Sequence, residues 1–271
     1  MLLVDAADCF CRLGFKFMQL NAYSVQLIVL FVKTARVRRG RGCLFPGGCA
    51  ILCAMIRLVA FLGNYGREYE RTRHNAAWQF ADALPFAGRL GWQEKFHGSY
   101  AAAERAALRE AFVECGLLPA SGGGLPRSAD GAERVFFLKP ETYMNLSGQS
   151  VGALADFFKI APEEILVVHD ELELPLGTVG LKWSGGLGGH NGLRSVKASL
   201  GTADFWRLRF GISKPSGADI AEYVLSPFLP DERIVLSQVF PQAAALLAKA
   251  LVSADAARLL PEWRKKKLSA D

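Results

Sequence analysis

Residues 57–75 read RLVAFLGNYGREYERTRHN, and this stretch decides the fold class. It begins with a short apolar run, Arg57–Leu62, which ends at Gly63 and is typical of a buried strand. Polar residues that include Asn64 and His74 then precede a segment with apolar residues at helical spacing. A buried strand, a polar loop and a helix in this order favour an α/β domain.

The same alternation continues along the chain. Further buried strands are predicted over residues 134–138, 165–169 and 208–212. Helices are predicted over residues 75–84, 148–160, 191–200 and 230–253. This order indicates a mainly parallel sheet with helices on both faces, in which functional sites lie just beyond the carboxyl ends of the strands.

The basic charge of the chain is concentrated before this region. The 271 residues carry a net charge of +6, and residues 1–54 hold seven Lys and Arg against two Asp, a net +5. Residues 55–271 hold 25 Lys and Arg against 24 Asp and Glu, a net +1. Global charge therefore gives no argument for nucleic-acid binding by the predicted domain.

Residues 1–54 do not have the pattern of a domain. Their longest apolar run, Val25–Val32, is much shorter than the about 20 residues of a membrane span, and the arginine cluster follows this run. Five of the six cysteines lie here, in spacings that match no zinc motif. We expect a non-domain leader or upstream sequence included by an early start assignment, with the working protein beginning at Met55.

Three polar clusters follow predicted strands. His74 has the chemistry of a general base near neutral pH, and Asp170 is the candidate partner that fixes its tautomer. Asn64, Asn145 and Asn191 offer uncharged donors, which suit a carbonyl substrate and a developing oxyanion better than a metal. Taken alone, these residues predict a hydrolase of a carbonyl or phosphoryl ester that uses activated water, with no metal and no cofactor.

Four motifs carry a resemblance to a known family. They are residues 62–75 (LGNYGREYERTRHN), 137–148 (FLKPETYMNLSG), 169–175 (HDELELP) and 188–193 (GGHNGL), in this order and spacing. The chain from about Met55 to Leu251 resembles bacterial peptidyl-tRNA hydrolase. The resemblance implies one three-layer α/β/α domain, residues 55–271, around a mixed, mainly parallel sheet, in a cytoplasmic monomer. It also implies hydrolysis of the ester between a peptide and the acceptor end of tRNA, with no metal, cofactor or membrane partner.

The resemblance assigns roles to single residues. His74 corresponds to the base that activates water, Asp170 to the carboxylate that holds it, and Asn64 to the amide beside the substrate carbonyl. The residues that correspond to contacts with the tRNA end and the peptide backbone are Tyr69, Tyr143, Met144, Asn145 and Asn191.

A local group of cations lies around the third and fourth motifs. We expect this group to contact tRNA phosphates. The net charge of the whole domain is too small to attract tRNA by itself, so a local group of cations is needed. Its members are Lys182, Arg194, Lys197, Arg207 and Arg209. The run Arg264–Lys267 is a second basic segment, for which a solvated tail is the simpler interpretation.

The sequence departs from the family pattern in three places, one of which is Leu187, where a leucine interrupts the glycine run. Tyr65 stands where the family usually has proline, which predicts a less rigid loop. Residues 101–133 are longer than the usual connection, and we expect a surface insertion made of a helix over 101–115 and a loop over 119–131. Two alternative classes stay open: a catalytically inactive RNA-binding protein on the same fold, and a different carboxyl-ester hydrolase.

Overall fold

The computed structural model describes residues 42–44, 50–52, 54–120, 134–215, 217 and 219–268. All of them belong to one compact unit, Gly42–Asp271. From the expected leader, this description includes residue 54 and two short strands that pair antiparallel, β1 (Gly42–Leu44) and β2 (Ala50–Leu52). The rest of the expected leader lies outside the described residues.

In the described part of the chain, eight strands form one mixed sheet in the order β10-β8-β9-β7-β3-β6-β5-β4. Strands β9, β7, β3 and β6 run parallel at its centre, and the strands at both margins pair antiparallel. The bounds of the strands are β3 Leu58–Phe61, β4 Gln93–Glu94, β5 Gly98–Glu104, β6 Arg134–Pro140, β7 Ile165–Glu171, β8 Thr178–Trp183, β9 Trp206–Gly211 and β10 Lys266–Lys267.

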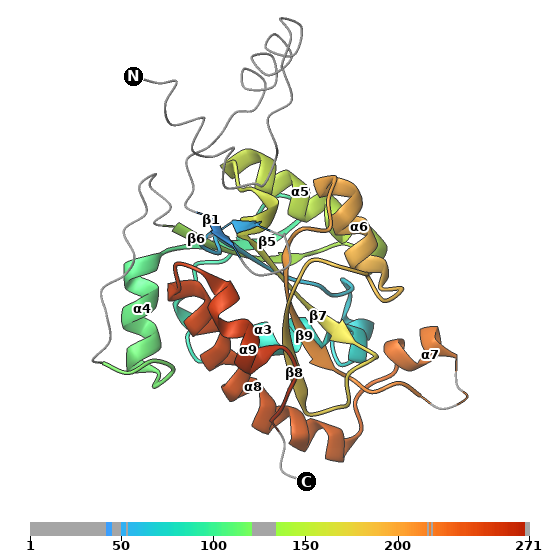
Figure 1. Cartoon of the computed structure of the whole chain (residues 1–271). Helices are drawn as coiled ribbons and strands as arrows, with labels where there is room; N and C mark the ends of the chain where they lie inside the picture. Colours follow the sequence, from blue (N-terminus) through green and yellow to red (C-terminus); the bar gives the residue numbers. More distant parts are fainter. Residues whose placement is uncertain are drawn as a thin grey trace, which may run out of the picture. The chain divides into compact units, whose positions relative to one another are not determined.

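Helices cover both faces of this sheet, so the described unit has the expected three layers (Figure 1). Helices α5 and α6 lie side by side on one face, and α3, α4 and α8 pack on the other. The bounds of the helices are α3 Ala76–Asp82, α4 Arg105–Glu114, α5 Ser147–Phe158, α6 Asn191–Leu200, α7 Ile220–Leu225, α8 Pro230–Val252 and α9 Leu260–Trp263.

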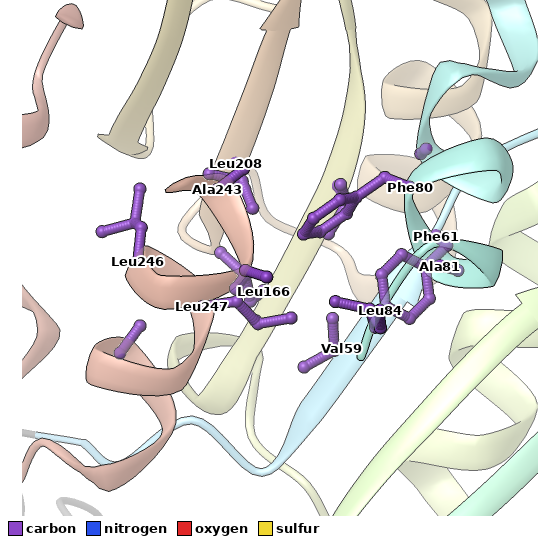
Figure 2. Packing of buried hydrophobic residues seen from close by; sticks show 14 of the residues in the cluster. Val59, Phe61, Phe80, Ala81, Leu84, Leu166, Leu208, Ala243, Leu246 and Leu247 are labelled. Atoms are coloured by element: carbon purple, nitrogen blue, oxygen red, sulfur yellow. The ribbon is translucent and has the colours of Figure 1, made fainter. Parts of the chain in front are cut away.

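The central strand β3 shows why the sheet needs two helical layers. Its side chains alternate in direction, and all four are buried. Leu58 and Ala60 belong to the apolar cluster under α5 and α6. Val59 and Phe61 pack into the opposite cluster with residues of α3 and α8, as Figure 2 shows. A strand that is apolar on both faces is stable only when both faces are covered.

Helix α8 is long and apolar enough to cross a membrane by length and composition alone. In the structure the apolar side chains on its inner face are part of the core instead, whereas Ile234 is exposed. Ala243, Leu246 and Leu247 face Leu166 and Leu208 of the sheet (Figure 2). Its composition is therefore explained by core packing.

The strand and helix positions predicted from apolar spacing are confirmed within a few residues. Helix α6 has the predicted bounds, and α8 ends one residue before the predicted end. The parallel strands β3, β6, β7 and β9 contain most of the predicted apolar runs. The carboxyl ends of these strands therefore meet at the edge where the sequence placed a site.

The predicted helix over residues 101–115 is partly wrong. Residues 101–104 belong to strand β5, which pairs with β6 over its whole length, and the helix begins at Arg105. Pairing with β6 overrides the helical preference of three consecutive alanines. Leu108 and Phe112 of α4 are buried in the core, so this half of the expected surface insertion is integral to the fold. Residues 121–133 lie outside the described residues.

Candidate active site

A cavity of about 740 Å³ opens at the carboxyl edge of the parallel strands. All the residues that were predicted from the sequence for catalysis or for contact with the tRNA end and the peptide line this cavity. They come from the loops after β3 and β6, from the end of β7 and from the start of α6. The residues are Asn64, Tyr69, His74, Tyr143, Met144, Asn145, Asp170 and Asn191.

His74 and Asp170 form a close pair in this cavity. Nδ1 of His74 lies 2.9 Å from Oδ1 and 3.0 Å from Oδ2 of Asp170, whose side chain is 2% exposed. Burial disfavours a charged imidazole, but the charge of Asp170 and the hydrogen bond to it outweigh burial, so the pKa of His74 is raised. When neutral His74 donates from Nδ1, the lone pair of Nε2 is available to accept a proton.

His190 is a second partner of Asp170 that the sequence reasoning did not single out. Its Nε2 lies 3.0 Å from Oδ1 of Asp170, and its Nδ1 accepts hydrogen bonds from the backbone N–H groups of Gly192 and Leu193. Burial alone would raise the pKa of Asp170. The charges and hydrogen bonds of the two histidines instead hold it well below its usual range. Asp170 is therefore a stable carboxylate.

The hydrogen bonds of His190 also decide whether this cluster suits a metal. Potential ligand atoms of His74, Asp170 and His190 lie within 4.8 Å of one another. However, Nδ1 of His190 must keep its lone pair for the two amides of α6, so Nε2 carries the proton and donates to Asp170. A protonated nitrogen does not ligate a metal. The cluster therefore fits a hydrogen-bonded chain better than a metal site.

His190, rather than Asn191, caps helix α6. Asn191 is the first residue of the helix, and its Oδ1 accepts a hydrogen bond from Arg194. This contact leaves the Nδ2 amide of Asn191 as the donor that can serve a ligand in the cavity it lines. An asparagine one position after the cap therefore contributes to the site and not to the cap.

Asn64 is held in place by a second buried asparagine. The backbone N–H of Asn64 donates to Oδ1 of Asn75 at 2.8 Å, and Nδ2 of Asn75 donates to the Asn64 carbonyl at 2.9 Å. Oδ1 of Asn64 accepts from the backbone N–H of Met144 at 2.7 Å. Since Oδ1 is used in this way, Nδ2 is the part of the Asn64 amide that can donate to a substrate carbonyl.

The loop around Asn64 is also tied at Tyr65. The backbone N–H of Tyr65 donates to the Thr142 carbonyl at 3.1 Å, a bond that a proline at this position could not make. The backbone of Tyr65 therefore joins the Asn64 loop to the loop that carries Tyr143. The expectation of a less rigid loop did not take this restraining hydrogen bond into account. Tyr143 itself packs edge-on against Tyr69, with ring centroids 6.5 Å apart.

Helix α7 supplies a wall of the cavity that no sequence motif indicated. Ile220, Val224 and Leu225 line the cavity together with Asp219, which caps the helix through a bond to the Ala221 N–H. The six residues of α7 contain no polar motif, so their sequence does not differ from that of any other short amphipathic helix. Only the tertiary structure places them opposite the polar residues of the strand loops.

The prediction that Arg207 contacts a phosphate is corrected by the structure. Arg207 is 1% exposed, and its two terminal nitrogens donate to the carbonyls of Gly186 and Gly185 at 2.7 and 2.8 Å. Its guanidinium therefore stabilises the glycine-rich loop that leads to His190. A sequence pattern of basic residues does not reveal which of them bond to the backbone.

The other predicted cations have different surroundings. Lys182 lies opposite Arg207 across the β8–β9 pair, and burial together with the charges of Arg207 and Arg209 lowers the pKa of Lys182. Arg209 donates to the Arg264 carbonyl at 2.8 Å and lies 3.8 Å from Glu171. Arg194 is exposed beside Asn191. These cations lie outside the lining of the cavity.

Fold and site together are typical of a class of α/β hydrolytic enzymes that carry a histidine held by a carboxylate. The family model described as peptidyl-tRNA hydrolase matches residues 58–270. The chain belongs to the peptidyl-tRNA hydrolase family. A peptidyl-tRNA hydrolase of Treponema pallidum is 47% identical over 217 residues, which are 79% of this chain and 96% of that protein. One of Desulfitobacterium hafniense is 41% identical over 198 residues, 72% of this chain and 94% of that protein.

Solved structures agree with these sequence relatives. A crystal structure of a peptidyl-tRNA hydrolase in complex with N-propanol superposes with a TM-score of 0.61 at 32% identity, covering 77% of this chain and 94% of that chain. Peptidyl-tRNA hydrolase from Acinetobacter baumannii superposes with a TM-score of 0.57 at 34% identity, covering 72% and 88%. The single-domain α/β fold expected from the resemblance is thereby confirmed.

Proposed function

We infer that the protein hydrolyses the ester bond of peptidyl-tRNA and releases free peptide and tRNA. The observation that carries this inference is the position of His74, with Nδ1 2.9 Å from Asp170, in a cavity lined by three asparagines. The membership in the peptidyl-tRNA hydrolase family supports the same substrate. The hydrolase domain in this proposal comprises residues 55–271.

His74 is the base of the proposed reaction. Its Nε2 accepts a proton from water as the water oxygen attacks the ester carbonyl carbon, and Asp170 stabilises the imidazolium that forms. The tetrahedral oxyanion then collapses, the bond to the 3′ oxygen of the tRNA ribose breaks, and His74 returns the proton to that oxygen. All atoms of ester and water are accounted for in the free acid and the free tRNA.

The asparagine amides bind the backbone N–H and C=O groups, which every peptide has. Asn64 is the donor beside the ester carbonyl, and Asn145 and Asn191 contact the backbone of the peptide and the tRNA end together with Tyr69 and Tyr143. Met144 lines the same pocket. Amide side chains hydrogen-bond peptide groups without reading side chains, which suits a substrate of any sequence, and preorganised donors stabilise the oxyanion.

The acceptor arm of tRNA lies against the cations beside the cavity. Lys182 is the best candidate for a phosphate contact, because Arg209 and Arg207 surround it with like charge that an anion would relieve. Arg209 and Arg194 complete the proposed contact surface. The protein works as a cytoplasmic monomer, with no resident metal or cofactor and no membrane partner.

The direct test compares tRNA charged with an N-blocked amino acid, tRNA charged with a free amino acid, and a simple alkyl ester. We expect release of the blocked amino acid, little release of the free one and no cleavage of the alkyl ester. Binding of the blocked substrate without release would favour the inactive RNA-binding protein. Equal cleavage of all three would favour a different ester hydrolase.

A further inference from the structure

Arg73 directly precedes His74, but its side chain binds a distant part of the chain. Its Nη1 lies 2.5 Å from Oγ of Ser226 and 2.8 Å from the Pro227 carbonyl oxygen. Its Nη2 lies 2.6 Å from Oε2 of Glu232, and the side chain is 6% exposed. One buried guanidinium thus joins the catalytic turn to the connection between α7 and α8, through what we name the Arg73 contact network (Arg73, Ser226, Pro227 and Glu232).

Ring and backbone contacts reinforce this connection. The guanidinium carbon lies 4.4 Å from the centroid of the Tyr223 ring, which belongs to α7, and 5.4 Å from that of Phe228. The backbone N–H of Arg73 donates to the Ser226 carbonyl at 3.0 Å, and Thr72 forms an isolated antiparallel bridge with Pro227. Both the main chain and the side chain at Arg73 therefore hold the end of α7.

Helix α7 needs such support from outside. It has six residues, and Ile220 and Leu225, which line the cavity, are 46% and 43% exposed. A helix this short is not stable by itself, so its position depends on contacts with the rest of the chain, among them the bond from the Tyr223 hydroxyl to the Ile212 carbonyl at 2.5 Å and the contacts at its two ends. The Asp219 cap fixes its first turn, and the Arg73 contact network fixes the chain just beyond its last turn.

We propose that Arg73 is a positioning residue that holds the apolar wall formed by α7 against the His74 turn. Arg73 does not touch the substrate in this proposal. It sets how well the cavity encloses the peptide portion next to the ester, and so it acts mainly on substrate binding. The proposal rests on the proposed function for its kinetic consequence, but the position of α7 can be measured without any substrate.

The substitution Arg73→Lys tests this role, because it keeps the positive charge but loses the planar fork that reaches Ser226, Pro227 and Glu232 together. We expect KM for N-blocked aminoacyl-tRNA to rise about tenfold, while kcat changes by less than about threefold. Hydrogen exchange of the α7 amides, measured without substrate, should become faster. Arg71→Lys, at an exposed neighbouring position, is the matched control and should leave both quantities unchanged.

If Arg73→Lys fails to fold, Glu232→Gln answers the same question, since it keeps the contacts to Ser226 and Pro227. A cross-link gives an independent rescue. Thr72 and Pro227 form a bridge flanked by the bonds Arg73 N–H to Ser226 and Phe228 N–H to Arg71. This is the non-hydrogen-bonded antiparallel pair, in which the two Cα atoms lie about 4.5 Å apart. Thr72→Cys with Pro227→Cys should therefore form a disulfide within the usual Cα range, to be verified by mass spectrometry under non-reducing conditions.

In the cross-linked protein, Arg73→Lys should have the same KM and the same slow hydrogen exchange of α7 as the cross-linked protein with Arg73. Reduction of the disulfide should bring back the raised KM and the fast exchange. The proposal is overturned if folded Arg73→Lys has unchanged KM and unchanged exchange, or if the verified cross-link rescues neither. If the wild-type protein cleaves no aminoacyl-tRNA, the proposed function fails. The exchange measurement then still decides whether Arg73 positions α7.

Discussion

Nε2 of His190 lies 3.0 Å from Oδ1 of Asp170, the carboxylate oxygen that also lies 2.9 Å from Nδ1 of His74. Because Nδ1 of His190 accepts from the first amides of α6, the start of this helix and the His74–Asp170 pair share one hydrogen-bonded chain. His190 thereby restrains the carboxylate that contacts His74. It also takes up part of the negative charge that Asp170 presents to His74.

Two substitutions of His190 separate its capping contact from its contact with Asp170. Asparagine is a good capping residue but is too short to reach Asp170, whereas alanine can make neither contact. Both variants lose the bond to the buried Asp170 and are less stable than wild type. We expect His190→Ala to be less stable than His190→Asn by about 1 kcal/mol, because only asparagine keeps the cap. Chemical denaturation followed by circular dichroism measures both. Equal destabilisation of the two variants would contradict the capping role.

The same two variants should change the pH dependence of activity. Without His190, the Asp170 carboxylate attracts the His74 imidazolium more strongly, so the pKa of His74 rises further. The base acts in its deprotonated form, and a higher pKa means that kcat/KM is lost at a higher pH on acidification. A pH profile of kcat/KM that does not move in either variant would show that His190 has no influence on the base.

Asp170→Asn should move the profile in the opposite direction. Burial, which lowers the pKa of His74, stays, while the charge of Asp170, which raises it, is removed. The acid limb of kcat/KM therefore moves to lower pH. The plateau falls by about 10²–10⁴-fold, because the tautomer and the imidazolium lose their support. An acid limb at higher pH than in wild type would contradict the assignment of Asp170.

Much of this site could be predicted from the sequence, because its residues follow apolar runs that form parallel strands. His74, Asp170 and Asn64 meet at one edge because the ends of parallel strands do so in any α/β sheet. His190 was missed, since a histidine beside glycines gives no local indication that it reaches a carboxylate twenty residues away in the chain.

The remaining differences arise from contacts between distant segments. Ala101–Ala103 become a strand because they pair with β6, although alanine favours helix. Arg207 looks like an exposed cation in the sequence but bonds to two glycine carbonyls. The α7 wall and its contact with Arg73 join residues more than 150 positions apart, which no local pattern records.

Lys182 should contribute to the salt dependence of tRNA binding. If it contacts a phosphate, Lys182→Gln weakens binding of tRNA and lowers the slope of log K against log salt concentration by about 1. Lys249→Gln, on the exposed side of α8, is the control and should leave the slope unchanged. A salt titration of tRNA binding by fluorescence anisotropy gives both slopes. Identical slopes in wild type and Lys182→Gln would exclude the phosphate contact.

The central claim is that His74 is the base that activates water. The most direct measurement is single-turnover release of peptide from N-blocked aminoacyl-tRNA by wild type and by His74→Ala, together with the Kd of each for the uncleaved substrate. We predict that His74→Ala loses about 10²–10⁴-fold in rate, as expected for removal of a general base, while its Kd stays close to wild type. A His74→Ala protein that cleaves the ester at the wild-type rate would contradict this account.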